Sequence, residues 1–132
     1  MCGQIEILLI DDDPYWLETL SDLLKRWGFA VKAVTNGVDA IRVFLDEKIR
    51  LVITDYEMPE MNGIELTRSL RNLSATIPIV MMSGDETDTT AYYARQVGVD
   101  AHVPKSADPE EIRRCIETVI YKLASPGRRK RS

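Results

Sequence analysis

Short apolar segments alternate with amphipathic segments along almost the whole chain. The apolar segments are typical of buried strands, and they lie at residues 5–10, 29–34, 51–54, 79–82 and 101–103. The amphipathic segments place apolar side chains every three or four residues, which predicts helices. We expect these helices at about residues 14–27, 38–47 and 64–73, over about ten residues ending at Val97-Gly98, and from about residue 109 onward.

Two of the expected helices have clear signals at their first residues. Asp13 precedes Pro14, which is a good N-cap residue followed by proline in the first turn. Asp108 and Pro109 repeat this signal, and the segment after them presents one continuous apolar face. Cys115 lies on that face, so we expect it to be a buried thiol.

The order of the segments predicts the fold class. Five strands that alternate with five helices indicate an α/β protein with a doubly wound, five-stranded parallel sheet. The strands are apolar on both sides of the pleat, as expected when helices cover both faces. The length of 132 residues fits one domain. We expect that domain to occupy residues 1–124, and residues 125–132 to form a basic tail or linker stub.

Composition excludes several classes of protein. The chain is 45% apolar and 29% charged, which is ordinary for a globular protein. No apolar run approaches the ~20 residues that span a bilayer, and the first residues lack the pattern of a secretory signal. We therefore expect a cytoplasmic protein with no membrane partner. Two cysteines and one histidine are too few for a disulfide framework or a multi-histidine metal site.

Charge is unevenly distributed. The net charge is −4, but residues 128–131 are all basic, so residues 1–127 carry 13 basic and 21 acidic side chains. Such an acidic body is a poor candidate for direct nucleic-acid binding. The basic tail is better interpreted as a solvated end or a linker stub than as a phosphate-binding segment.

Chemically active residues follow several of the strands. Asp11 and Asp12 follow the first strand, Asp55 the third, Ser83 the fourth and Lys105 the fifth. The carboxyl ends of parallel strands meet at one edge of the sheet, where α/β proteins bind ligands. We therefore expect three carboxylates, a hydroxyl and an ammonium to lie together.

This set of groups suits phosphoryl transfer. Clustered carboxylates need a cation, and Mg²⁺ prefers oxygen ligands of this kind. Asp55 can then attack phosphorus as a nucleophile. Mg²⁺, Lys105 and Ser83 can compensate the charge of the phosphoryl oxygens.

The chain resembles the receiver domain of a bacterial two-component response regulator and is similar to the stand-alone chemotaxis regulators. The resemblance covers essentially residues 5–124. It rests on four segments: Ile7-Leu-Leu-Ile-Asp11-Asp12-Asp13, Thr54-Asp55-Tyr-Glu-Met58-Pro59 with Gly63, Met82-Ser83-Gly84, and Gly98-Val-Asp-Ala-His-Val-Pro-Lys105.

The resemblance implies a flavodoxin-like strand order of 2-1-3-4-5 and a signalling domain rather than an enzyme. It also implies that Asp55 is the phosphoacceptor, which receives its phosphoryl group from a histidine kinase or a phosphotransfer protein. Asp11 and Asp12 would be the acidic pair of a Mg²⁺ site, with Asp12, Asp55 and the backbone carbonyl of Glu57 as ligands. Ser83 and Lys105 would contact the phosphoryl group.

Two positions depart from the family pattern. The residue three before the lysine is usually Tyr or Phe, a switch ring that moves inward with the Ser/Thr hydroxyl, and here it is His102. A histidine can make this movement, but histidine titrates near neutral pH. The resemblance therefore implies that Ser83 and His102 are a switch pair whose coupling of phosphorylation to output is altered or depends on pH. The other interpretation is an exposed histidine at a strand end. In addition, Ser106 replaces the usual proline after Lys105, which predicts either a strained cis bond or a reshaped loop.

The resemblance also places residues that tune hydrolysis and output. Glu57 and Asp85 stand two residues after Asp55 and Ser83, where family members adjust phosphoryl lifetime. Output would come from the fourth helix, fifth strand and fifth helix, which bind a downstream protein partner or an effector domain. On the fourth helix, aromatic and basic groups are available for such binding: Tyr92, Tyr93, Arg95 and Gln96. They also fit a helix that is partly buried and partly solvated.

Two other functions remain open on the sequence. Asp11 and Asp13 match the spacing of an aspartate-nucleophile phosphatase, although Pro14 follows them and no cap domain is evident. A receiver-like binding module that is never phosphorylated is the other alternative. The modified residue distinguishes them: Asp55 in a receiver, Asp11 in a phosphatase, and neither in a binding module.

Overall fold

The computed structural model describes residues 4–84 and 88–124 and contains five strands and five helices in strict alternation. The strands are β1 (Glu6–Ile10), β2 (Ala30–Val34), β3 (Leu51–Asp55), β4 (Ile79–Ser83) and β5 (Ala101–Pro104). The helices are α1 (Pro14–Arg26), α2 (Gly37–Asp46), α3 (Gly63–Leu73), α4 (Asp88–Gln96) and α5 (Pro109–Ala124). All ten elements expected from the sequence are present, and their ends shift by one or two residues.

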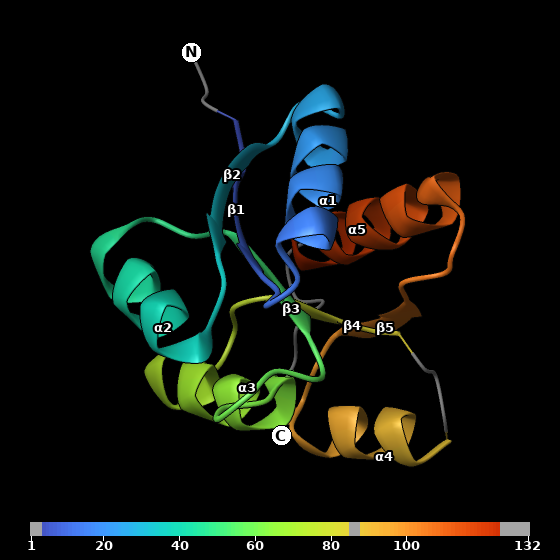
Figure 1. Ribbon diagram of the computed structural model, residues 1–132. Coiled ribbons are helices and arrows are strands. Elements are labelled where there is room, and N and C mark those ends of the chain that lie inside the picture. The colour runs from blue at the N-terminus through green and yellow to red at the C-terminus, as the bar shows by residue number, and fades with distance from the viewer. Residues whose placement is uncertain (1–3, 85–87, 125–132) are drawn as a thin grey trace.

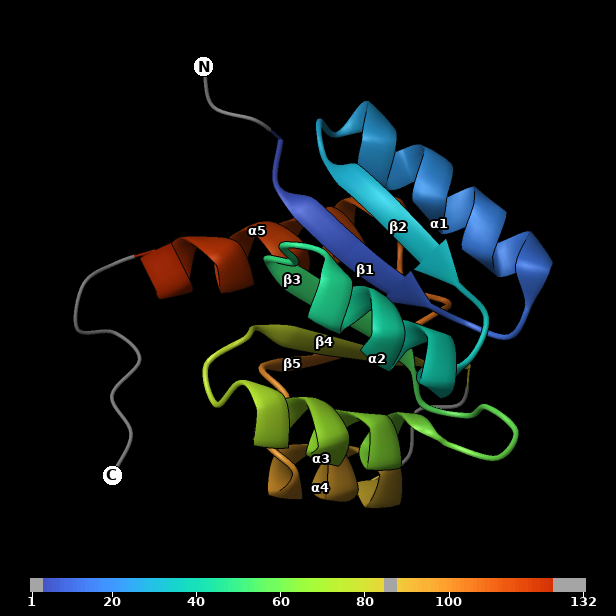
Figure 2. The same ribbon diagram turned by 90° about the vertical axis from the view of Figure 1, so that its left-hand side faces the viewer.

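The strands form one fully parallel sheet in the order β2-β1-β3-β4-β5. This confirms the doubly wound fold and the strand order that the resemblance implied. Helices α1 and α5 cover one face of the sheet, and α2, α3 and α4 cover the other (Figures 1 and 2). Among the described helices, none is both long enough and apolar enough to cross a bilayer.

Alternate residues of the central strands supply a hydrophobic core to each face. Ile7 and Leu9 of β1 pack with α1 and α5, whereas Leu8 and Ile10 pack with α2 and α3. All four side chains are at most 1% exposed. Both faces of β1, β3 and β4 are therefore apolar because both are covered.

The edge strand β2 differs from this expectation. Its side chains are only partly buried, and Lys32 and Ala33 are exposed. A strand with one free edge has less cover, and a charged residue there also discourages pairing with another chain. The prediction that all strands are apolar on both sides is thus wrong for β2.

The helix ends follow the expected chemistry. The Asp13 side chain caps α1 by accepting a hydrogen bond from the backbone of Tyr15, and Pro109 is the first residue of α5. The Cys115 thiol is half-buried rather than buried, and it packs against the core beneath α1 and α5. Burial raises its pKa and the nearby Glu111 carboxylate raises it further, so the thiol stays protonated.

Candidate functional site

The register of the sheet places the candidate residues at one edge. Asp55 is the last residue of β3 and is paired with Met82 of β4, so Ser83 lies one residue further along. Ser83 is in turn paired with Pro104, and the backbone N–H of Lys105 donates to the Ser83 carbonyl at 2.8 Å. Consecutive strand pairings therefore bring together residues that are 50 positions apart, as the sequence predicted.

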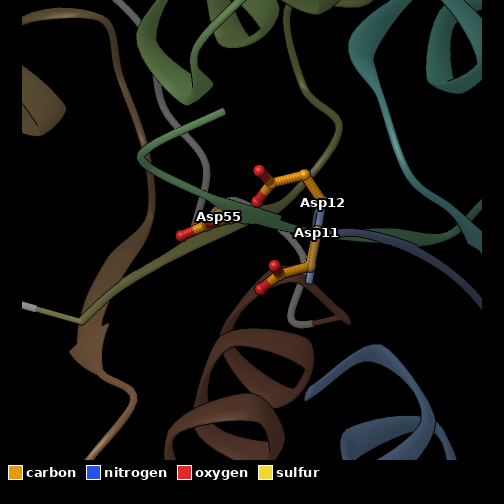
Figure 3. Close-up of side chains that lie close together, drawn as sticks. All are labelled: Asp11, Asp12 and Asp55. Atoms are coloured by element: carbon orange, nitrogen blue, oxygen red, sulfur yellow. The ribbon is translucent and has the colours of Figure 1, made fainter. Parts of the chain in front are cut away.

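Three carboxylates meet where β1 and β3 end. One oxygen each from Asp11, Asp12 and Asp55 lies within 4.8 Å of the other two. Figure 3 shows these side chains projecting from the ends of the two adjacent strands into the same region. Asp11 and Asp55 are 2% and 5% exposed, whereas Asp12 is exposed. Such a cluster of like charges is unfavourable unless a cation is close.

Lys105 supplies one such cation. Its Nζ lies 2.7 Å from Asp11 Oδ2 and 3.4 Å from Asp55 Oδ1. Burial by itself lowers the pKa of Lys105, but hydrogen bonds and charges from Asp11 and Asp55 outweigh it and raise the pKa above its ordinary value. The ammonium is therefore charged at every physiological pH, and it is bound mainly to Asp11.

Asp55 has an unusual environment for an aspartate. Burial raises its pKa, and the charge of Asp11 raises it further. Lys105 and a backbone hydrogen bond from Glu57 act in the opposite direction, and the balance is a pKa of about 6 instead of 3.8. Without a further cation, negative charge on Asp55 is thus disfavoured, which is the situation that a bound divalent ion would reverse.

The donor set fits Mg²⁺. The three carboxylates are hard oxygen ligands, and the side of Asp12 that faces solvent leaves room for waters. A groove lined by Asp12, Asp55, Glu57, Met58, Pro59, Gly84 and Lys105 opens beside them. Asp55 is therefore reachable from outside even though it is buried.

Both oxygens of the Asp11 carboxylate make contacts with neighbouring groups. Its Oδ2 binds Lys105, and its Oδ1 accepts the backbone N–H of Asp13 at 2.9 Å. Asp13, the second carboxylate of the phosphatase-like pattern, is exposed and caps α1. Because Asp11 is bound to Lys105 and Asp13 caps α1, the two are poorly placed to act as nucleophile and acid. The structure therefore fits Asp55 better than Asp11 as the nucleophile.

The loop after Asp55 is shaped by close backbone contacts. The Gly63 N–H donates to the Tyr56 carbonyl at 2.9 Å, and a Cβ on Gly63 would collide with the carbonyl of Asp55. Within the loop, Glu60 has a φ of 72°, and Met61 N–H donates to the Pro59 carbonyl, which makes a γ-turn. The Met-Pro…Gly spacing therefore brings the start of α3 directly against the end of β3.

Ser83 and His102, which the sequence predicts to be a switch pair, are in contact. Ser83 Oγ lies 3.3 Å from Nε2 of His102, which is partly buried, so His102 is not simply an exposed strand-end residue. After Lys105, the described chain contains no cis peptide bond. Instead, Ala107 N–H donates to the Pro104 carbonyl, and Lys105-Ser106 forms the middle of a turn. Of the two predicted outcomes, the reshaped loop is the one found.

Asp85, expected to tune hydrolysis, lies outside the described residues. Trp16 was not singled out from the sequence, yet its ring lies beside Lys105, with Nζ 5.8 Å from the ring centroid. The capping box between Asn62 and Glu65 at the start of α3 was also missed, although its Asn-x-x-Glu spacing was a usable signal.

The fold and the site define a doubly wound α/β protein with an acidic pocket and a lysine at the carboxyl edge of its sheet. The chain belongs to the response regulator receiver domain family, whose sequence model matches residues 7–117. This confirms the resemblance drawn from the four sequence motifs.

Individual relatives agree with this family. The chain is 34% identical over 122 residues to the transcriptional regulatory protein CpxR homolog of Haemophilus influenzae, covering 92% of this chain and 53% of the relative. It is 30% identical to the transcriptional regulatory protein ZraR of Salmonella typhimurium, covering 95% of this chain and 28% of that protein. The chain thus spans about half or less of these relatives' lengths.

Solved structures show the same fold. A CheY-like receiver domain protein from Methanospirillum hungatei matches with a TM-score of 0.89 at 22% identity, covering 95% of this chain and 100% of that one. A LuxR-family two-component response regulator from Aurantimonas matches with a TM-score of 0.84 at 29% identity, covering 90% and 86%.

Proposed function

We propose that this chain is a signalling receiver that accepts a phosphoryl group on Asp55. The observation that supports this most strongly is the position of the Lys105 ammonium between Asp11 and Asp55, beside Asp12. A nucleophilic carboxylate, a cation fixed next to it and an acidic cluster able to hold a second cation are the parts that phosphoryl transfer requires.

The proposed reaction is a single displacement at phosphorus. A carboxylate oxygen of Asp55 attacks the phosphoryl group of a phosphohistidine on a kinase or phosphotransfer protein. The new P–O bond forms as the P–N bond breaks, and its electron pair returns to the histidine ring. Lys105 and the Ser83 hydroxyl bind the phosphoryl oxygens on the product. The domain is not an enzyme in the ordinary sense, because it modifies only itself and later loses the group to water.

Mg²⁺ is the proposed cofactor. Asp12, Asp55 and the Glu57 carbonyl would hold it, and Asp11 would complete the acidic site while also anchoring Lys105. When bound, the ion supplies positive charge to the carboxylates and to the phosphoryl oxygens. Glu57 is exposed and lines the groove, so we expect Glu57→Asn to alter the lifetime of the phosphoryl group. An unchanged dephosphorylation rate would remove this role.

Phosphorylation would change the surface of α4, β5 and α5. Ser83 and His102 are in contact, so a phosphoryl group that draws the Ser83 hydroxyl toward Asp55 would change that contact and let the His102 ring move inward. The outer side of α4 carries Tyr92 and Tyr93, which are 51% and 48% exposed and stack edge to face at 5.4 Å. A shift between two arrangements of this surface would control binding of a partner protein or an effector domain.

Residues 1–124 would form the receiver and residues 125–132 a basic tail or linker stub, in a cytoplasmic protein. The upstream partner would be a histidine kinase or a phosphotransfer protein. We also propose that this domain does not bind nucleic acid directly and does not contact a membrane, because the body of the chain is strongly acidic.

The test is phosphorylation by a small phosphodonor, followed by intact-protein mass. With Mg²⁺ and acetyl phosphate, the wild type should gain one phosphoryl group. Asp55→Asn should abolish the gain, and Asp12→Asn should raise the Mg²⁺ concentration required for it. Asp39→Asn, which changes a carboxylate on α2, is the matched control and should behave like the wild type. Labelling that persists in Asp55→Asn would contradict the proposal.

A further inference from the structure

The tryptophan beside Lys105 is not part of the proposed chemistry. Trp16 is the third residue of α1, and its ring faces the Lys105 ammonium, with Nζ 5.8 Å from the ring centroid. An aromatic face attracts a cation within about 6 Å. The ring is partly buried and packs against the core between the sheet, α1 and α5, so its position is fixed by more than this contact.

The first turn of α1 is tied to the residue that binds Lys105. Asp11 Oδ1 accepts the backbone N–H of Asp13 at 2.9 Å, and Asp13 Oδ1 accepts that of Tyr15 at 3.0 Å. One short segment therefore presents both a carboxylate and an aromatic ring to the same ammonium. The first turn of α1 therefore holds the two groups that contact the lysine ammonium in fixed positions.

Lys105 depends on these contacts for its position because the lysine side chain itself is flexible. A lysine ammonium is a strongly hydrated point charge on a four-carbon stem, and this side chain is 20% exposed. Its contact with Asp55, at 3.4 Å, is looser than the 2.7 Å contact with Asp11. Water can therefore compete for the ammonium on any side that the protein leaves open.

We propose that Trp16 is a positioning residue that keeps the Lys105 ammonium beside Asp55 and thereby speeds phosphoryl transfer to that carboxylate. This inference rests on the proposed function. Trp16 acts through Lys105 and does not touch the phosphoryl group. Its contribution is to raise the fraction of molecules in which Lys105 is in place when a phosphodonor arrives.

The chain contains its own matched control. Trp27, the C-cap residue directly after α1, faces the guanidinium of Arg113 with 5.7 Å to the ring centroid. It is also partly buried and packs against the same core as Trp16. Trp16 and Trp27 are therefore the same residue type, lie in or directly after α1, pack against the same core, and each face a cationic side chain. They differ in that only the cation facing Trp16, Lys105, belongs to the site.

The first experiment compares initial rates of Asp55 labelling by acetyl phosphate at saturating Mg²⁺. A contact worth about 0.5–1 kcal/mol corresponds to about a two- to five-fold slower rate in Trp16→Leu. Trp16→Phe, which keeps an aromatic face, should lie between, and Trp27→Leu should match the wild type. In a Lys105→Met background, Trp16→Leu should cause no further loss, because its partner is already gone.

A second measurement needs neither Mg²⁺ nor phosphorylation. The chain has two tryptophans, so Trp16 is the only one left in Trp27→Phe. Lys105→Met in that protein should shift the Trp16 emission, whereas Arg113→Met should leave it unchanged. This measurement reports the contact of ring and ammonium in a folded protein directly.

The outcomes separate this inference from the proposed function. Wild-type labelling with an undiminished rate in Trp16→Leu would overturn the role of Trp16 alone. An equal slowing in the Lys105→Met background would do the same, since it would indicate a general packing effect. An unlabelled Asp55 in the wild type would overturn the proposed function and this inference with it, even if the emission shift were present.

Discussion

Asp11 and Asp12 are neighbours in the sequence, yet their carboxylates lie in different surroundings. Asp11 is buried, and it joins Lys105 to the start of α1. Asp12 is exposed at the groove. Asp11 is thus suited to organise the site, and Asp12 to exchange water for a cation.

At this scale we predict that Asp55→Asn stabilises the metal-free protein at neutral pH. The pKa of native Asp55 is about 6, above its ordinary 3.8, so the native state binds this proton more tightly than the unfolded state does. Stability from this group is therefore complete below about pH 4 and lost as pH rises through about 6. The variant should gain about 1–3 kcal/mol in free energy of unfolding at pH 7.

Urea unfolding of both proteins in the presence of a chelator measures this difference. The gain should shrink toward zero near pH 4, and added Mg²⁺ should stabilise the wild type much more than Asp55→Asn. A gap that is independent of pH, or a variant less stable at pH 7, would contradict the assigned environment of Asp55.

Much of the site was predictable at the level of single residues, but their pairing was not. Asp11, Asp12, Asp55, Ser83 and Lys105 could be chosen because each follows a predicted strand. That Lys105 binds Asp11 more closely than Asp55, or that Trp16 faces it, depends on side-chain geometry that no spacing rule contains. The contact between His102 and Ser83 was likewise only suggested by the resemblance.

Among the secondary-structure elements, β3 and α3 meet through a close backbone contact. Gly63 begins α3 in direct contact with the backbone of Asp55 and Tyr56. We predict that Gly63→Ala lowers the free energy of unfolding by about 1–3 kcal/mol, because the added carbon forces the backbone apart. It should also slow phosphorylation, since the displaced backbone carries Asp55, the proposed acceptor.

Gly84→Ala is the control for this substitution. Gly84 follows Ser83 at the same edge of the sheet, but a Cβ there would meet no atom of the described residues within 4 Å apart from its own chain neighbours. Thermal unfolding should therefore place Gly84→Ala within about 0.5 kcal/mol of the wild type. Equal losses in the two variants would show that backbone contact at Gly63 is not the cause.

A second junction lies at the opposite end of the sheet. Arg71 of α3 donates to the carbonyls of Ile77 at 2.6 Å and Gly98 at 2.7 Å, and it pairs with Asp100 at 3.3 Å. It thereby connects α3 to the segments that enter β4 and β5. We predict that Arg71→Met lowers the free energy of unfolding, as measured in urea. Each lost hydrogen bond from the charged guanidinium should cost no more than about 1.5–3 kcal/mol.

Arg68→Met provides the comparison, because Arg68 is an exposed residue of the same helix. It should change stability by less than about 0.5 kcal/mol. If Arg68→Met proved as costly as Arg71→Met, the loss would reflect the charge of α3 rather than the connection that Arg71 makes.

Element types were predictable from apolar spacing, and their ends were predictable to within one or two residues. Strong caps such as Asp13-Pro14 and Pro109 account for that accuracy. The γ-turn at Glu60 could not be predicted, because glutamate rarely adopts a positive φ and the sequence contains no sign of it. The exposure of β2 also could not be predicted, since it depends on which strand lies at the edge of the sheet.

At the scale of the whole molecule, the parallel sheet accounts for the site. Because all five strands point the same way, their carboxyl ends form a single edge, and residues that follow or end β1, β3, β4 and β5 lie there. Parallel pairing could be argued from the alternation of strands and helices. The order β2-β1-β3-β4-β5 needed the family resemblance, since hydrophobic pattern does not distinguish one buried strand from another.

The most direct measurement is the identity of the aspartate that carries the phosphoryl group. Protein treated with Mg²⁺ and acetyl phosphate is reduced with borohydride, which converts an acyl phosphate to an alcohol, and the altered residue is located by peptide mass spectrometry. The account predicts modification at position 55 and a loss of that signal when Mg²⁺ is chelated. Modification at Asp11, or at no aspartate in folded protein supplied with Mg²⁺, would contradict it.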